Sequence, residues 1–173
     1  MTAYLAAALV LVFPALVIVA ALRDAASYTI PNSISLALLA AFPPAALALG
    51  LPLPAIGLHA AIGLVALLAG MAMFAMNWIG GGDAKLFAAA ALWLGFPAVA
   101  SFLLGTCVAG GLLALLLLTL RSARVRPLVT AGPGWLVRLA EPGESVPYGL
   151  AICAGALAAF PASPLIGAFR AFA

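Results

Sequence analysis

Long apolar segments, separated by short polar breaks, dominate this chain of 173 residues. Each segment is close to the roughly 20 residues that an α-helix needs to cross a bilayer. Hydrophobic residues make up 68% of the chain and charged residues only 6%, which leaves too little polar surface for a water-soluble domain of this length. The sequence therefore predicts an all-α, polytopic integral membrane protein with about six transmembrane helices. The expected spans are residues 4–22, 33–51, 55–76, 84–100, 102–120 and 148–167.

The number of spans depends on one weak break, between the fourth and fifth segments. Only Gly95, Pro97 and Ser101 interrupt the apolar sequence there, so a count of five is the alternative. The first segment is apolar and N-terminal, as a secretory signal would be. However, no Lys or Arg precedes it and it is longer than a typical signal core, so we expect a retained helix.

Positive charges fall almost entirely into alternate breaks. If the N-terminus lies outside, the cytoplasmic breaks are residues 23–32, residues 77–83 with Lys85 just beyond, and residues 121–147. Because Lys and Arg accumulate in short cytoplasmic segments, this orientation is the predicted one, and it places Asp24 and Asp83 on the cytoplasmic side. Only Arg170 is left on the far side. The cytoplasmic cations are Arg23, Lys85, Arg121, Arg124, Arg126 and Arg138.

The net charge of +3 does not indicate a nucleic-acid partner. The cations between Arg121 and Arg138 alternate with apolar residues, a pattern that suits contact with an anionic lipid leaflet. Cys107 and Cys153 lie inside apolar spans without a neighbouring His or Cys, so they predict neither a zinc site nor a disulfide. We expect membrane lipid as a partner, no metal and no cofactor, and the oligomeric state stays open. Glycines that allow close helix packing are Gly57, Gly63, Gly70, Gly105, Gly110 and Gly111.

Asp24 and Asp83 are two of only four acidic residues, and each stands where an apolar segment meets a polar break. Carboxylates beside lipid are costly and commonly functional. Each also has a structural interpretation: Asp24 as a charge that marks the water interface, and Asp83 as a helix cap. Capping does not require the three glycines at 80–82, which permit unusual backbone conformations. We therefore predict a paired-aspartate site at a membrane face.

Two carboxylates that share a water molecule can hydrolyse a peptide bond. They do not both ionise easily, so one keeps its proton while the other acts as a base. The ionised acid takes a proton from the attacking water, and the protonated acid donates to the developing oxyanion. No competing set is visible, because His59 is alone near the outer face and no Ser or Cys has a base beside it. The alternative from another class is a non-enzymatic transport or assembly subunit whose acids contact ions or protons.

Three short motifs contain the acids or open the last span. Asp24 is followed by Ile30-Pro31-Asn32, then come Gly80-Gly81-Gly82-Asp83-Ala84-Lys85-Leu86, and finally Val146-Pro147-Tyr148-Gly149. In this order the motifs resemble those of the prepilin peptidases, especially the short form that serves Flp-type (tight-adherence) pili. The resemblance covers nearly the whole chain. The Gly-x-Gly-Asp element alone is shared with other intramembrane aspartyl proteases, whereas the ordered set is more specific.

The resemblance implies catalytic roles for Asp24 and Asp83. It implies that the glycines Gly80, Gly81 and Gly82 let Asp83 approach its partner and the substrate backbone. Lys85 either anchors the helix end at the lipid headgroups or tunes the nearby acid, and Pro31 and Pro147 suit the first turn of a following helix. The other residues carried over as supporting or substrate-binding are Asn32, Tyr148 and Gly149.

The resemblance also implies a single transmembrane peptidase domain over residues 1–173. Its substrate would be the leader of a type IV (Flp-type) prepilin or pseudopilin, cut at the cytoplasmic face of the inner (plasma) membrane. Long members of the family carry a cytoplasmic N-terminal region with a tetracysteine metal site, whereas this chain begins almost at once with an apolar segment. The resemblance therefore predicts cleavage and leaves N-methylation of the mature pilin open. An archaeal preflagellin-type peptidase is the nearer alternative.

Overall fold

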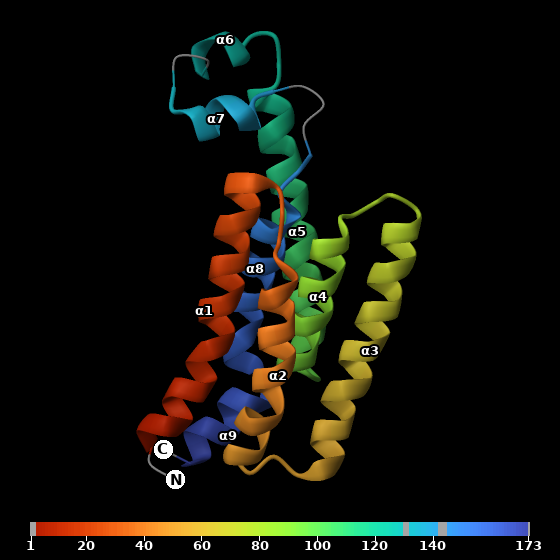
Figure 1. The fold of residues 1–173 in the computed structure, drawn as a ribbon, viewed down its shortest axis with the longest axis vertical. Helices are drawn as coiled ribbons and strands as arrows, with labels where there is room; N and C mark the ends of the chain where they lie inside the picture. Colours follow the sequence, from red (N-terminus) through yellow and green to blue (C-terminus); the bar gives the residue numbers. More distant parts are fainter. Residues whose placement is uncertain (1–2, 130–131, 142–144, 173) are drawn as a thin grey trace.

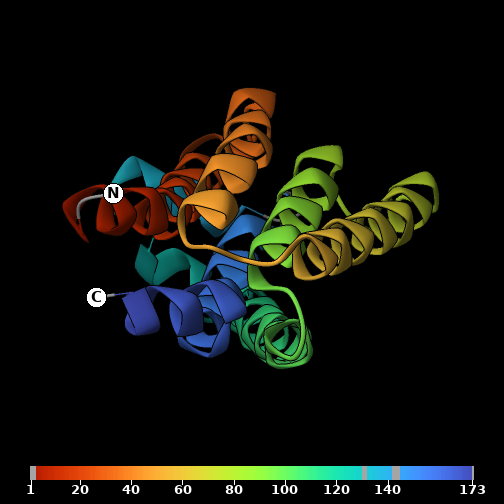
Figure 2. The same ribbon diagram turned by 90° about the horizontal axis from the view of Figure 1, so that it is seen from below.

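The described part of the structure, a computed structural model, is built from helices without a strand. It comprises residues 3–129, 132–141 and 145–172. Figures 1 and 2 show a bundle of long helices with two short ones at one end. The all-α prediction is therefore confirmed. The helices are α1 (Ala3–Ser27), α2 (Asn32–Ala48), α3 (Leu53–Ala75), α4 (Gly81–Leu94), α5 (Ala98–Leu120), α6 (Arg126–Val129), α7 (Gly134–Leu139), α8 (Tyr148–Ala159), the 3-10 helix η1 (Phe160–Ala162) and α9 (Pro164–Phe172).

Several helices are long and apolar enough to cross a membrane. Three qualify on their own, in α1, α3 and α5, and a fourth does if the bent pair of residues 148–162 and 164–171 is one span. The prediction of a polytopic membrane protein is thus confirmed. With 17 residues in α2 and 14 in α4, these two are shorter, so the count of six spans stays a prediction.

Helix boundaries differ from the expected spans at three places. Helix α1 continues to Ser27, so Asp24 lies in its last turn and not beyond it. The fourth segment is helical over 81–94 and stops at Gly95, which has a left-handed φ of 60° that a glycine adopts without strain. The break before α5 thus consists of residues 95–97, and Ser101 lies within α5.

The last apolar segment is not one straight helix. Residues 148–162 and 164–171 meet at a bend of 41°. Ser163 between them is extended, with ψ of 148°, as expected for a residue that precedes a proline, here Pro164. The expected continuous span over 148–167 is therefore wrong as a single helix.

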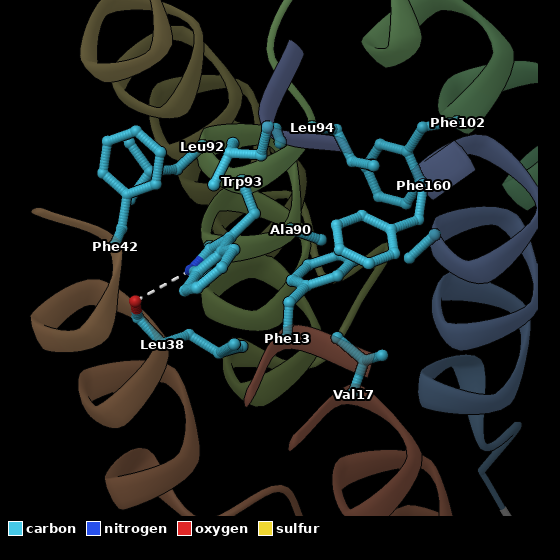
Figure 3. Packing of buried hydrophobic residues seen from close by; sticks show 14 of the residues in the cluster. Phe13, Val17, Leu38, Phe42, Ala90, Leu92, Trp93, Leu94, Phe102 and Phe160 are labelled. Carbon is cyan, nitrogen blue, oxygen red and sulfur yellow. Dashed lines mark hydrogen bonds between the residues drawn. The ribbon is translucent and has the colours of Figure 1, made fainter. Parts of the chain in front are cut away.

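Helix α4 lies at the centre of the bundle and packs against α1, α2, α3, α5, α8 and α9. Its second half is buried, and Trp93 is its largest buried side chain. The Trp93 indole N–H donates to the Leu38 carbonyl oxygen at 2.8 Å, and its ring stacks on Phe13 at 5.5 Å between centroids (Figure 3). Phe13 in turn contacts Phe160 at 4.7 Å. This aromatic cluster joins α4 to α1, α2 and the end of α8.

One end of the bundle gathers most of the polar breaks. The end of α1, the start of α2, the α3–α4 turn, α6, α7 and the start of α8 all lie at the top of Figure 1, while both termini lie at the bottom. Six of the seven cations lie at this end: three in these elements, Lys85 in the first turns of α4, and Arg121 and Arg124 in the connection from α5 to α6. The structure therefore brings Asp24 and Asp83 to the same end, as predicted, and the cytoplasmic orientation of that end stays a prediction.

Candidate active site

A polar pocket of about 280 Å³ opens at this end of the bundle, and both Asp24 and Asp83 line it. Its walls come from the end of α1, the α3–α4 turn, the first turn of α4 and the segment that enters α8. Two acids from distant parts of the sequence thus share one small space. The other lining residues are Tyr28, Asn77, Trp78, Ile79, Gly80, Ser145, Val146 and Tyr148.

Asp24 is held by the start of α8. Its side chain is only 4% exposed, and its Oδ2 accepts a hydrogen bond of 2.7 Å from the Gly149 backbone N–H. A helix N-terminus favours a negative charge, so the first turn of α8 stabilises this carboxylate. A charge that merely marks the water interface would be exposed, so the structure argues against that interpretation of Asp24.

Gly149 is required at its position by space. A Cβ atom there would lie 2.9 Å from both Cβ and Oδ2 of Asp24. Any side chain would therefore push the helices apart or displace the carboxylate. The predicted Val146-Pro147-Tyr148-Gly149 motif acts on Asp24 through this close approach, with Tyr148 also lining the pocket.

Asp83 is the third residue of α4 and precedes the expected span 84–100. Its Oδ2 accepts the Gly80 N–H at 3.3 Å, which is one half of a capping box; Gly80 has no side chain to complete the other half. Its Oδ1 is buried and has no hydrogen-bond partner among the described residues. The capping interpretation therefore accounts for one oxygen and leaves the other available in the pocket.

The electrostatics of the pocket link the two acids. Burial, followed by the negative charge of Asp24, raises the pKa of Asp83 to about 6, while the Gly80 N–H acts in the opposite direction. The carboxyl group of Asp83 thus holds its proton at a pH where an ordinary aspartate is ionised. A carboxyl group that keeps its proton in this way can act as the acid of a pair.

The three glycines before Asp83 lie in tight surroundings. A Cβ at Gly80 would be 2.9 Å from Asp83 Oδ2, and one at Gly82 would be 3.1 Å from the Ile30 Cβ. Gly81 faces a second, apolar cavity instead of the polar pocket. We expected these glycines to provide backbone freedom. In the structure, close packing of the α3–α4 turn explains why a side chain does not fit at Gly80 or Gly82.

The remaining predicted residues lie around the pocket, not in it. Pro31 and Pro147 are the N-cap residues of α2 and α8, one position before the first turn in which we expected them. Asn32 and Lys85 line the apolar cavity, and Lys85 Nζ donates to Asn32 Oδ1 at 2.9 Å. Lys85 therefore bridges α4 and α2.

Sequence reasoning missed two lining residues with left-handed backbones, Tyr28 at φ 52° and Asn77 at φ 58°. Each follows the end of a helix, α1 or α3, where such a conformation is common. Asn adopts it readily, and this could have been a signal. Tyr does so at a cost of about 1 kcal/mol, which indicates that the surroundings of Tyr28 fix it.

The interval between α5 and α8 covers this end of the bundle through two arginines. Arg121 donates to the carbonyl oxygens of Leu139 and Ser145, both at 3.0 Å. Arg138 donates to the Ala26 carbonyl oxygen at 3.0 Å, which ties α7 to the last turn of α1. These bonds hold Ser145 and Val146 in the pocket wall, a role that the lipid-contact interpretation of the interval did not include.

Metal ligands do not gather in the described residues: they contain no group of three or more His, Cys, Asp or Glu side chains that could hold an ion. His59 is buried in α3, and its Nδ1 donates to the Leu92 carbonyl oxygen at 2.7 Å. Its ring packs on Phe42 at 5.3 Å. Its place in the core fits a structural role.

Comparison with known proteins yields one match. A model of the type IV leader peptidase family matches residues 11–115, a stretch that includes Asp24 and Asp83 and ends before the motif at 146–149. No match was found among curated proteins or among solved structures.

Proposed function

We propose that this chain, which belongs to the type IV leader peptidase family, is an aspartic endopeptidase whose catalytic pair is Asp24 and Asp83. The observation that carries the proposal is that both acids line one buried pocket at the same end of the bundle. Membership in a peptidase family argues against the non-enzymatic transport or assembly subunit.

The arrangement supports different roles for the two aspartates, one as general base and the other as general acid. Both carboxyl groups are buried, and each accepts a backbone N–H: Gly149 donates to Asp24 Oδ2 at 2.7 Å, and Gly80 donates to Asp83 Oδ2 at 3.3 Å. The shorter bond favours the ionised form of Asp24 more strongly. Asp24 is accordingly the base that takes a proton from water as the water oxygen attacks the scissile carbonyl carbon. Asp83 is the acid that donates its proton to the developing oxyanion. Collapse of the tetrahedral intermediate then breaks the C–N bond: the amine leaves with the proton that Asp24 took from water, and a hydroxyl of the intermediate returns a proton to Asp83.

The proposed substrate is the leader of a type IV prepilin or pseudopilin, of the Flp type. The family implies prepilin-type substrates. The excess of Lys and Arg at the pocket end supports cleavage at the cytoplasmic face of the inner membrane. A pocket at the end of a membrane bundle suits a peptide bond that lies just outside the bilayer.

Processing of a candidate Flp-type prepilin in membranes tests this function. The variants are Asp24→Asn and Asp83→Asn, and Glu141→Gln is the matched control because Glu141 is exposed and outside the pocket. Each aspartate variant should lose cleavage by about 10²-fold or more, because the loss of a general acid or base costs at least that much. The control should cleave at the wild-type rate.

Immunoblots of the membrane fraction establish that each variant is present at the wild-type level. Cleavage at the wild-type rate by either Asp→Asn variant would overturn the assigned pair. A parallel reaction with an archaeal preflagellin tests the nearer alternative, because a preflagellin-type enzyme would process that substrate in preference to the prepilin.

A further inference from the structure

An apolar groove with a volume of about 850 Å³ runs down the side of the bundle between α2 and α3. Helix α4 forms its floor, and α2 and α3 form its walls. Figures 1 and 2 show α4 between the other two helices. The wall residues Leu36 and Leu39 on α2, and Leu64 and Met71 on α3, are more than half exposed, so the groove opens sideways. Among the described lining residues Lys85 alone is charged.

The groove exists because both walls pack on α4. Gly63 and Gly70 fix α3 against α4: a Cβ at Gly63 would lie 2.9 Å from the Leu92 Cβ, and one at Gly70 would lie 3.1 Å from the Ala84 Cβ. Helix α2 is held to α4 by the Trp93 bond to Leu38 and the Lys85 bond to Asn32. These contacts set the spacing of the walls.

The end of the groove that lies beside the pocket is crossed by a polar bridge. Lys85 Nζ donates to Asn32 Oδ1 at 2.9 Å, from the first turns of α4 to the first residue of α2. The bridge joins the floor to the α2 wall at this end. The exposed apolar edge between the two walls opens the groove sideways to the bilayer, so we expect an occupant to enter from there.

The floor of the groove suits a helix. Gly81, Ala84, Ala88 and Ala89 line it, and small residues let the backbone of another helix approach closely. From Gly81 to Leu92 the floor extends for about 16 Å at 1.5 Å per residue, which corresponds to about three helical turns. Apolar walls on both sides would contact the side chains of such a helix.

The groove and the polar pocket lie on opposite sides of the first turn of α4. Gly81, Ala84 and Lys85 line the groove, whereas Gly80 and Asp83 line the pocket. A chain that leaves the groove at this turn reaches the acids by passing Gly80 and Gly81, which have no side chains of their own.

The resemblance to prepilin peptidases implies a precursor that is cut just before a hydrophobic segment. We propose that the groove between α2 and α3 binds this segment as a helix in the membrane while the adjoining peptide bond is cut at the acid pair. This inference rests on the proposed function and adds the surface that holds the uncut precursor. The groove and the pocket both border the first turn of α4, so a substrate that is cut at the acids is the occupant that contacts both. We therefore choose the substrate over a lipid or a second copy of the chain.

Leu64 and Leu68 offer a matched test, because both lie on α3 and both are 57% exposed, but only Leu64 lines the groove. Leu64→Trp should fill the groove and raise KM for the full-length prepilin about tenfold, the scale of an overpacked contact. Leu68→Trp should leave KM unchanged. Both variants should cleave a soluble peptide that spans the cut site, without the apolar segment, at the wild-type rate.

Photo-crosslinking gives a second readout that does not need turnover. A benzophenone amino acid at position 64 or 68 of the inactive Asp83→Asn protein is irradiated in membranes that contain the prepilin. Crosslinks to the apolar segment of the prepilin from position 64, and not from 68, are expected. Crosslinks from 64 to lipid or to a second copy alone would overturn the inference.

Equal KM values for Leu64→Trp and Leu68→Trp would also overturn it. The proposed function would survive both of these failures, since it depends on loss of cleavage in Asp24→Asn and Asp83→Asn. The proposal for the groove and the proposal for the catalytic pair can therefore be rejected independently.

Discussion

The two ends of α4 show opposite uses of buried polar groups. At the far end, Trp93 is fully buried, its N–H is bonded to Leu38, and aromatic rings fill the surrounding space. At the near end, Asp83 Oδ1 is buried without a described partner, and Asp83 lines a pocket that it shares with Asp24. One short helix thus anchors the bundle at its last turn and presents a carboxyl group at its first. The far end serves the stability of the bundle, and the near end serves its chemistry.

Among these changes the largest effect on cleavage is expected from Gly149→Ala, which changes the surroundings of Asp24 at the near end. The new Cβ would lie 2.9 Å from Asp24 Oδ2 and displace that carboxylate. Since displacement of a catalytic group by about 1 Å costs about 10²-fold, the rate of prepilin cleavage in membranes should fall by that factor. Gly111→Ala is the control, because a Cβ there meets nothing within 4 Å. Similar cleavage rates for the two variants would show that the close approach of Gly149 to Asp24 is not needed for catalysis.

A smaller effect is expected from pH. Asp83, with a pKa of about 6, is protonated below that pH and ionised above it. If its proton is the one donated in the reaction, kcat/KM for the prepilin should fall about tenfold per pH unit above pH 6, with an apparent pKa that belongs to the coupled pair. Tryptophan fluorescence should show no unfolding between pH 5 and 8. A kcat/KM that rises between pH 5 and 8 would show that Asp83 is not the acid that donates the proton.

The smallest effect on cleavage is expected from a change at the far end. Trp93→Ala removes a buried ring and should lower the free energy of unfolding in detergent by about 3 kcal/mol. Cleavage of a soluble peptide that spans the cut site, per folded molecule, should stay near the wild-type rate, because Trp93 does not line the pocket. Trp78→Ala is the counterpart at the near end: Trp78 is 64% exposed and lines the pocket, so it should lower cleavage more than stability. A larger loss of cleavage in Trp93→Ala, or a larger loss of stability in Trp78→Ala, would contradict the contrast between the two ends.

Several features of the fold followed from the sequence on physical grounds. The cation distribution placed Asp24 and Asp83 at one end, because a helix that crosses a membrane alternates its ends between the two sides. Close helix packing was expected at glycines, and it occurs at Gly63, Gly70 and Gly105, where a Cβ would lie within about 3.1 Å of the neighbouring helix. At Gly57 and Gly111 a Cβ would meet nothing within 4 Å.

The division of the site between pocket and groove could not be read from the sequence. Asp83 and Ala84 are neighbours in α4, yet Asp83 lines the pocket and Ala84 lines the groove, because each residue of a helix points 100° away from the last. Which direction faces which neighbour depends on the rotation of α4 in the bundle, and tertiary packing sets this rotation. The same limit applies to Tyr28, whose left-handed backbone contradicts its local preference.

The sideways opening of the groove between α2 and α3 has a consequence for the timing of events in the cell. If a precursor reaches the groove only from within the bilayer, a newly made chain has to be inserted by other machinery before it is processed. Cutting would then report successful insertion, and a precursor stalled in the cytosol would keep its leader even beside abundant enzyme.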